Sequence, residues 1–202
     1  MANFTRSGYG QIEPNQLSAQ KTGQIYASLP LDEKVEVLQN GEFMYYSYAD
    51  GAVTATPTLG GGEPMLVYNE VKLYEEPYRT TYKDFAMIRV GDNYVTSKLA
   101  TAGYGDGAEN KGADIVEHTE YPYRMDGIAP RVFKTNVGDI YTTNMVATGV
   151  EYAVGDKLAP AVSSNNTLVL EKNDAATGMV WQVVKVYTMP DGQPGLKLQR
   201  IQ

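Results

Sequence analysis

The sequence predicts a mainly β protein, made of small β-barrel or β-sandwich units with an extended N-terminal arm. No segment of ten or more residues that lacks Gly and Pro has apolar side chains at helical spacing. The chain holds 20 Gly and 10 Pro, so the runs between these breakers are short, as in strands. A polar, breaker-rich composition sets residues 1–31 apart from the rest and predicts the arm.

Residues 1–31 are rich in Gln, Ser and Asn, and their isolated apolar residues are too sparse to form a core. We therefore expect this extended arm to become ordered only on a partner. Four apolar side chains are the expected anchors on that partner: Ile12, Leu17, Ile25 and Leu29. The alternative is an ordinary disordered tail.

Residues 32–99 are predicted to form a first β subdomain. Lys34–Leu38 alternates with a period of two, as a strand does. Asn40-Gly41 predicts a tight turn, because both residues tolerate positive φ, and Glu42–Tyr48 is the expected partner strand. Asp50-Gly51 predicts a second turn. Further strands are expected at Ala52–Ala55, Met65–Tyr68, Val71–Tyr74 and Phe85–Val90.

Residues 100–131 are predicted to be a long irregular connection, because Gly and Pro interrupt them repeatedly. Loops of this length are usually functional or mobile. Asp106–Gly112 resembles a calcium loop, but Ala108 stands where an oxygen ligand is needed. A weaker calcium site remains an alternative, formed by Asp106, Glu109, Asn110 and Asp114.

Residues 132–202 are predicted to form a C-terminal β-barrel-like subdomain. Each face of the run Val180–Val186 carries one polar residue, so we expect this strand to be buried on both faces. Its expected strands are Ile140–Thr143, Val150–Val154, Thr167–Leu170, Met179–Tyr187 and Leu196–Ile201.

Three segments begin with Val-Gly-Asp, at residues 90–92, 137–139 and 154–156. Each motif is followed within two residues by an apolar side chain. The pattern predicts a turn that leads into a strand, in which Gly supplies a positive φ and Asp bonds the amides just beyond it. We interpret the repeat as structural and not catalytic.

Composition excludes several classes of function. Acidic residues outnumber basic ones by 24 to 17, for a net charge of −7, which argues against nucleic-acid binding. The absence of Cys excludes disulfides, thiolate metal sites and cysteine nucleophiles. No 18-residue apolar run and no signal-peptide h-region is present, so we expect a soluble chain that spans no membrane and is made in the cytoplasm.

Motifs for catalysis are missing as well. The sequence contains neither a nucleophile elbow nor a phosphate-binding loop. The single histidine, His118, has no histidine partner, and a solvated loop position explains it most simply. No spacing singles out a pair of carboxylates for glycoside cleavage. We therefore predict a protein that is not an enzyme and has no cofactor and no metal.

Tyrosine dominates the aromatic residues, with 16 Tyr against 4 Phe and 1 Trp. Tyr suits half-buried sheet faces, and it is equally suited to protein interfaces. The cluster Tyr45-Tyr46-Ser47-Tyr48 is therefore either part of a sheet face or a contact surface.

A series of turn and strand patterns carries a family resemblance. In chain order the patterns are Phe133–Thr143, Val154–Pro160, Leu168–Leu170, Trp181–Lys185 and Asp191–Leu198. They resemble the capsid decoration and auxiliary head proteins of tailed bacteriophages. Residues 35–56 look like a first, similar unit, and Gln16–Gln20 resembles the arms with which phage head proteins reach onto a neighbour.

This resemblance implies a structural virion protein on the capsid surface, a decoration (cement) or minor head protein. Its partners would be the major capsid protein and neighbouring copies of itself, as a homo-oligomer on the virion. It would act by adding buried area across capsomer boundaries, multiplied over many copies. Two alternatives remain: a tail, head-fibre or baseplate subunit, and a carbohydrate-binding or glycan-hydrolysing virion protein that uses the Tyr clusters as stacking platforms.

Overall fold

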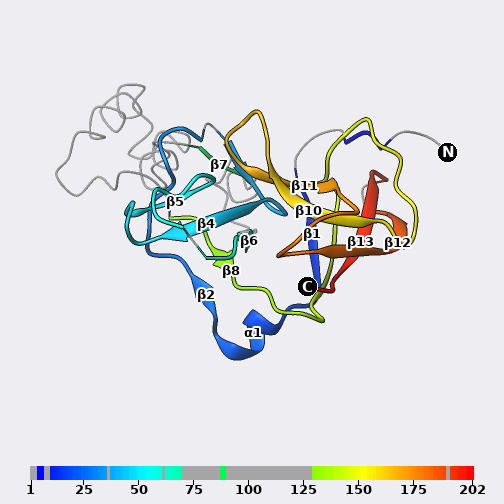
Figure 1. Cartoon of the computed structure of the whole chain (residues 1–202), viewed down its shortest axis with the longest axis horizontal. Coiled ribbons are helices and arrows are strands. Elements are labelled where there is room, and N and C mark those ends of the chain that lie inside the picture. Colours follow the sequence, from blue (N-terminus) through cyan, green and yellow to red (C-terminus); the bar gives the residue numbers. More distant parts are fainter. Residues whose placement is uncertain are drawn as a thin grey trace, which may run out of the picture.

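The computed structural model describes residues 4–6, 10–35, 37–60, 62–69, 87–89, 129–189 and 192–202. Strands account for 41% of these residues and helix for 4%, which confirms the mainly β class. The strands form a curled antiparallel sheet in the shape of a half-barrel, which is consistent with the predicted barrel-like fold (Figure 1). The described part of the chain has one short helix, α1 (Ser18–Thr22).

Most of the strands are short, as the spacing of Gly and Pro predicts. The longest, β12, has 8 residues. In chain order they are β1 (Ile12–Gln16), β2 (Ile25–Tyr26), β3 (Val37–Gln39), β4 (Phe43–Ser47), β5 (Ala52–Thr54), β6 (Met65–Val67), β7 (Met87–Arg89), β8 (Val132–Phe133), β9 (Ile140–Thr143), β10 (Lys157–Val162), β11 (Leu168–Lys172), β12 (Trp181–Thr188) and β13 (Pro194–Arg200).

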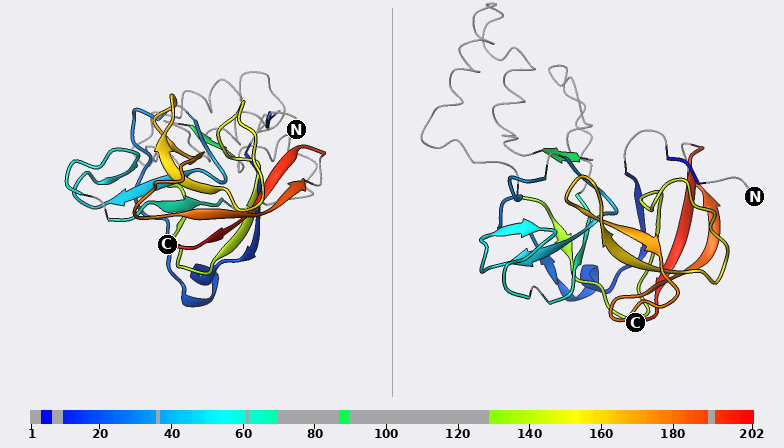
Figure 2. Two further views of the ribbon diagram at one scale, coloured as in Figure 1. Left: turned by 45° about the vertical axis from the view of Figure 1, so that its right-hand side comes forward. Right: turned by 45° about the horizontal axis from the view of Figure 1, so that its top comes forward.

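Eleven strands form one sheet, in the order β1-β9-β13-β12-β10-β11-β4-β6-β8-β2, with β5 paired to β4. We call β2, β4, β5, β6 and β8 the first half of the sheet, and β1 and β9–β13 the second half. β3 and β7 form a separate two-stranded sheet. Both ends of the long order, β1 and β2, come from the N-terminal segment, which Figure 2 shows in blue, reaching from one half to the other.

The second half curls back towards its own start. β12 and β13 pair along their whole length, with an irregularity between Val183 and Lys185. A parallel bridge joins Val146, just after β9, to Leu170 of β11. The strands β9, β13, β12, β10 and β11 therefore form a curled, barrel-like unit.

The prediction that the β12 segment is buried on both faces is wrong for its second part. Trp181 and Val183 are fully buried, whereas Lys185 and Val186 are exposed. The irregularity after Val183 interrupts the alternation that would carry the buried face onward. Beyond it, β12 continues to pair with β13 as one arm of a hairpin.

The two halves of the sheet meet at a narrow junction. The register between β11 and β4 consists of one residue pair, Leu168 opposite Phe43. By contrast, β10 pairs with β11 over five residues, from Leu158 to Val162. We call the single pair the β11–β4 junction.

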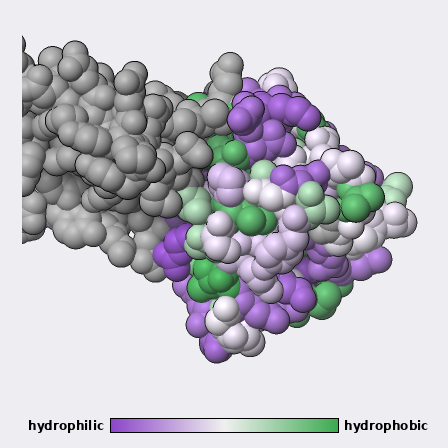
Figure 3. Space-filling view, turned by 90° about the vertical axis from the view of Figure 1, so that its left-hand side faces the viewer, coloured by the Kyte–Doolittle hydropathy of each residue, from purple (hydrophilic) through white to green (hydrophobic). Residues whose placement is uncertain are grey.

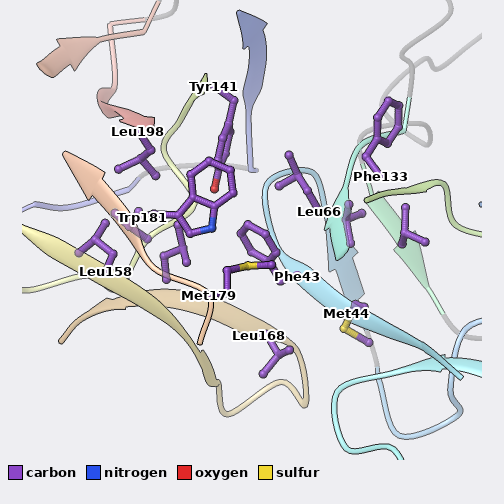
Figure 4. Close-up of a cluster of buried hydrophobic side chains, with 14 of the residues drawn as sticks. Phe43, Met44, Leu66, Phe133, Tyr141, Leu158, Leu168, Met179, Trp181 and Leu198 are labelled. Carbon is purple, nitrogen blue, oxygen red and sulfur yellow. The ribbon is translucent and has the colours of Figure 1, made fainter. Parts of the chain in front are cut away.

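The core continues across this junction, with Phe43 at its centre (Figure 4). On the side of the second half, the Phe43 ring centroid lies 5.9 Å from that of Trp181 and 6.4 Å from that of Tyr141. On the side of the first half, Leu66 and Phe133 are fully buried. Packing of large apolar side chains therefore holds the two halves of the sheet together where a single main-chain pair connects them.

The predicted division at residue 132 does not follow the boundary between the halves. β8 begins at Val132, yet it pairs with β6 and β2 of the first half. The change from one half to the other comes after Phe133, on the way to β9. Of the predicted irregular connection, 100–131, only residues 129–131 lie within the described part of the chain.

The predicted hairpin between 34–38 and 42–48 is also wrong, although the Asn40-Gly41 turn is present. β3 pairs with β7, and β4 pairs with β5, β6 and β11. The Gln39 amide, which a hairpin would aim at the facing strand, donates instead to the Glu42 carboxylate at 2.7 Å. The Gly41 amide donates to the Val67 carbonyl at 2.9 Å, so the turn leads into a pairing with β6.

Candidate functional site

The four predicted partner anchors lie against this chain's own core. Leu17 is 2% exposed and is part of that core. Ile12, Ile25 and Leu29 are half-buried and pack against it. The expectation that the segment becomes ordered only on a partner is therefore wrong, because the rest of the same chain supplies the apolar surface that the segment lacks. Binding of a partner by these side chains stays a prediction.

Main-chain pairing holds the segment in place at two distant edges. Ile12 of β1 lies opposite Thr143 of β9, and Ile25 of β2 lies opposite Phe133 of β8. Without these strands, β8 and β9 would each expose a row of unpaired N–H and C=O groups. β1 is itself a weak template for further pairing, because Pro14 has no N–H to donate. The segment therefore covers both edges of the sheet.

Phe4 anchors the start of the segment. Its amide donates to the Val150 carbonyl at 2.9 Å, and its carbonyl accepts from the Gly149 amide at 2.8 Å. Its ring meets that of Tyr152 edge-on, with 5.6 Å between centroids. Residues 150–154 were expected to form a strand, but they form a loop and a turn, and Phe4 takes the pairing that a neighbouring strand would have provided.

Asp139 fixes helix α1 between the two edges. Its Oδ1 accepts from the Ser18 amide at 3.0 Å, and its Oδ2 accepts from the Ser18 hydroxyl at 2.9 Å. Leu17 stands at the N-cap position and has no side chain that can cap the helix. A carboxylate 121 residues further along the chain caps it instead.

The two described Val-Gly-Asp turns have the same main-chain design. Gly138 has φ 96° and Gly155 has φ 97°. The Gly138 amide donates to the Arg200 carbonyl and the Gly155 amide to the Val183 carbonyl, both at 2.8 Å. Each motif leads directly into a strand, β9 or β10, as predicted.

The aspartates of these turns act differently from the prediction. Asp139 accepts from the Asn136 amide at 2.9 Å, and Asp156 accepts from the Ala153 amide at 2.8 Å. Each carboxylate therefore bonds an amide three residues before it, not one beyond it. Asp156 also pairs with Lys172 at 2.8 Å, and this hydrogen bond is the main reason why the pKa of Asp156 is lowered.

Both turns present a valine to solvent. Val137 is 66% exposed and Val154 is 67% exposed. We call this pair the turn-tip valines. Because each turn is fastened to the β12–β13 hairpin by main-chain bonds, the two side chains are held on rigid supports. The third copy of the motif, at residues 90–92, lies outside the described residues.

Three tyrosines form a ladder on the first half of the sheet. The ring centroids of Tyr26 and Tyr46 are 5.2 Å apart, as are those of Tyr46 and Tyr48. The Tyr46 hydroxyl is 2.5 Å from the Ser28 hydroxyl, and its ring is buried. Tyr48 is 74% exposed, so the cluster predicted from the sequence is part sheet face and part accessible surface.

A second exposed apolar side chain lies close to this ladder in the fold. Leu59 is 69% exposed, and its loop is tied to the β4–β5 turn because Asp50 accepts from the Thr58 amide at 3.1 Å. Figure 3 looks at the molecule from this side and shows apolar residues as small separate patches among hydrophilic ones. The visible surface therefore offers point contacts, not one broad apolar area.

Sequence patterns did not reveal the most perturbed carboxyl of the described residues. Glu42 is 1% exposed. Its Oε2 accepts from the Gln39 amide at 2.7 Å, and its Oε1 accepts from the Thr167 hydroxyl at 2.8 Å. Burial raises the pKa of Glu42 to about 7, although both hydrogen bonds and the charge of Arg6 act in the opposite direction.

Arg6 brings the N-terminal segment close to this carboxyl. Its guanidinium contacts the Met145 sulfur. Burial lowers the pKa of Arg6, and the negative charge of Glu42 acts against that shift. The sequence offered one signal for Glu42: it is an acidic residue directly after a tight turn and directly before a strongly apolar strand. An acidic residue at such a position more often faces solvent, so the pattern did not predict its burial.

The remaining chemical candidates lie outside the described residues. They are His118 and the weaker calcium site of Asp106, Glu109, Asn110 and Asp114. Among the residues that the structure does describe, no group of three or more His, Cys, Asp or Glu side chains is arranged to hold a metal ion. No helix in that part of the chain has the length and apolarity to cross a membrane.

No known protein family matches the chain, and no curated protein or solved structure is significantly similar to it.

Proposed function

We propose that the protein is a structural virion protein that binds and stabilises a bacteriophage capsid shell, as a decoration or minor head protein. The observation that carries the proposal is the pair of Val-Gly-Asp turns, which are part of the resemblance to phage head proteins. Both are built alike, and both present an exposed valine on a rigid support. The protein acts by binding the major capsid protein and its own neighbouring copies, without turnover and without a cofactor.

Small apolar contacts suffice for such a role. Full burial of one valine side chain contributes about 1.5–3 kcal/mol before other costs are subtracted. A single copy held by two valines binds weakly. A coat of many copies, each also touching its neighbours, gains strength by avidity.

Locating the protein in virions tests this proposal. Purified phage particles are separated into heads and tails, and each fraction is analysed by mass spectrometry and with antibodies against this chain. We expect the protein in the head fraction, together with the major capsid protein. Recovery from tails alone would support the tail, head-fibre or baseplate alternative, and absence from both fractions would contradict a virion role.

The turn-tip valines give a sharper prediction. The double variant Val137→Asp/Val154→Asp should fold normally, because both side chains are exposed, and should bind heads stripped of this protein at least about tenfold more weakly. Tenfold corresponds to about 1.4 kcal/mol, less than one buried valine contributes. Co-sedimentation measures the affinity. Val162→Asp, also at an exposed valine, is the matched control, and an unchanged affinity of the double variant would rule out these contacts.

The tyrosine ladder favours a second candidate, a carbohydrate-binding or glycan-hydrolysing virion protein. Tyr48 presents an accessible ring that Tyr46 supports from the side, an arrangement on which a sugar can stack. If this candidate holds, Tyr48→Ala should weaken binding to purified peptidoglycan or lipopolysaccharide about tenfold, and Tyr187→Ala on β12 should not. Wild-type protein that binds neither glycan in a pull-down would eliminate the candidate.

A further inference from the structure

Glu42 and Thr167 lie on either side of the β11–β4 junction. Glu42 directly precedes Phe43, and Thr167 directly precedes Leu168, the two residues that form the single pair between these strands. The 2.8 Å bond between Thr167 Oγ1 and Glu42 Oε1 therefore joins the two halves of the sheet beside their narrowest main-chain connection.

A second hydrogen bond leads from Thr167 towards the surface. Thr167 Oγ1 is also 2.8 Å from Ser163 Oγ, and either oxygen of that pair can be the donor. Ser163 opens the β10–β11 turn and is half-buried. A chain of two hydroxyl groups thus leads from the buried carboxyl to a residue within reach of water.

This chain accommodates both protonation states of the carboxyl. When Glu42 is ionised, Ser163 donates to Thr167 and Thr167 donates to Glu42. When Glu42 is protonated on Oε1, the carboxylic acid donates to Thr167 and Thr167 donates to Ser163. The proton added to Glu42 is taken up from solvent, and the heavy atoms need not move.

The two states differ in the charge that is buried. The groups packed on the carboxyl from the β3–β4 turn and the β10–β11 turn are the Gln39 amide and the Thr167 hydroxyl, both neutral. Within the described part of the chain, Arg6 of the N-terminal segment is the one charged group that acts on the carboxyl. Ionisation therefore leaves a nearly fully buried negative charge with one cation to balance it.

We propose that Glu42, Thr167 and Ser163 form a proton-responsive latch on the β11–β4 junction. The neutral carboxyl holds the two halves of the sheet together, and its ionisation loosens them, because opening at the narrowest connection lets water reach the charge. The inference is independent of the proposed virion role.

The direction of the pH effect follows from linkage. Burial raises the pKa of Glu42 to about 7 in the folded chain, above its ordinary value of 4.5. Stability from this group is therefore fully present below about pH 4.5 and declines as the pH rises through about 7. From pH 5 to pH 8, the unfolding equilibrium constant should rise on the order of 10- to 100-fold on account of this group.

The chain contains a natural reporter of the junction. Trp181 is its single tryptophan, and its ring lies 5.9 Å from Phe43. Urea unfolding followed by Trp181 fluorescence at pH 5, 6, 7 and 8 gives the equilibrium constant at each pH. We expect the wild type to lose stability across this range and Glu42→Gln, which keeps the shape of the neutral acid, to lose little.

Glu171→Gln is the matched control, because it makes the same chemical change at an exposed position on β11. It should retain the wild-type pH dependence. A wild-type profile without this loss, or a Glu42→Gln variant that keeps it, would overturn the proposal. If Glu42→Gln does not fold, Arg6→Gln provides the test. Removing the nearby cation should move the pH midpoint of the stability loss to higher pH. An unchanged pH midpoint would count against the latch.

Hydrogen exchange shows which part of the sheet loosens as the pH rises. After correction for the chemical exchange rate, the amides of Phe43 and Leu168 should lose protection between pH 6 and pH 8 in the wild type but not in Glu42→Gln. The amides paired between β12 and β13 should change less, because their extensive pairing is remote from the carboxyl. An equal loss of protection in both places would show a global effect and contradict a latch at the junction.

Discussion

Leu17→Asp is expected to unfold the protein, or to lower its free energy of unfolding by about 4 kcal/mol or more. Leu17 is 2% exposed and lies between the strands that cover the two edges of the sheet. The substitution removes a large apolar contact and buries a carboxylate among the apolar side chains of the core. A loss of this size is comparable with the whole stability of a typical domain.

Leu59→Asp provides the matched control, since the same substitution at a 69% exposed leucine should change stability by less than about 0.5 kcal/mol. Urea unfolding followed by Trp181 fluorescence measures both variants. If Leu17→Asp folded with normal stability and lost only its binding to capsids, the segment would be a partner-binding arm after all.

Gly41→Ala is expected to cost about 3 kcal/mol or more, because two separate penalties act at this position. Gly41 has φ +94°, a conformation that L side chains rarely adopt. A Cβ atom there would lie 2.5 Å from the Thr143 hydroxyl and 2.8 Å from Cβ of Met145, and neither neighbour is the end of a long flexible side chain. The new methyl group would push the β3–β4 turn away from the end of β9.

Gly51→Ala separates the two penalties. Gly51 also has a positive φ, +66°, but a Cβ atom there would meet nothing within 4 Å. We expect a loss of only about 1 kcal/mol from backbone strain. The difference between the two variants in thermal or urea unfolding measures the close contact together with the extra backbone strain at φ +94°. Equal losses would show that the approach of Gly41 to Thr143 does not matter.

Sequence patterns located the strands whose signal is local. β9 has the predicted bounds, and β4, β6, β11 and β12 fall within a few residues of prediction, because alternation and turn dipeptides depend on neighbouring residues only. The strands that were missed carry contrary local signals. β10 contains Pro160, β1 contains Pro14, and β2 and β8 have only two residues each. All four are strands because of the partners that they meet in the folded sheet.

The features of the candidate site also separate into those with a local sequence signal and those that depend on distant residues. The Val-Gly-Asp turns were predictable, because a positive φ at Gly is a property of the motif itself. The fate of residues 1–31 was not, since local composition cannot show that a sheet edge far along the chain needs covering. The burial of Glu42 was not predictable for the same reason: the hydroxyl that packs on its carboxyl belongs to Thr167, 125 residues further along the chain.

The placement of both edge strands near the start of the chain has a consequence for synthesis. Residues 12–26 leave the ribosome before their partners in β8 and β9, which are made more than a hundred residues later. The segment must therefore wait unpaired while the rest of the sheet forms, and its docking can only come late. Such long-range closure makes folding slow and leaves strand edges open to other nascent chains until the last step.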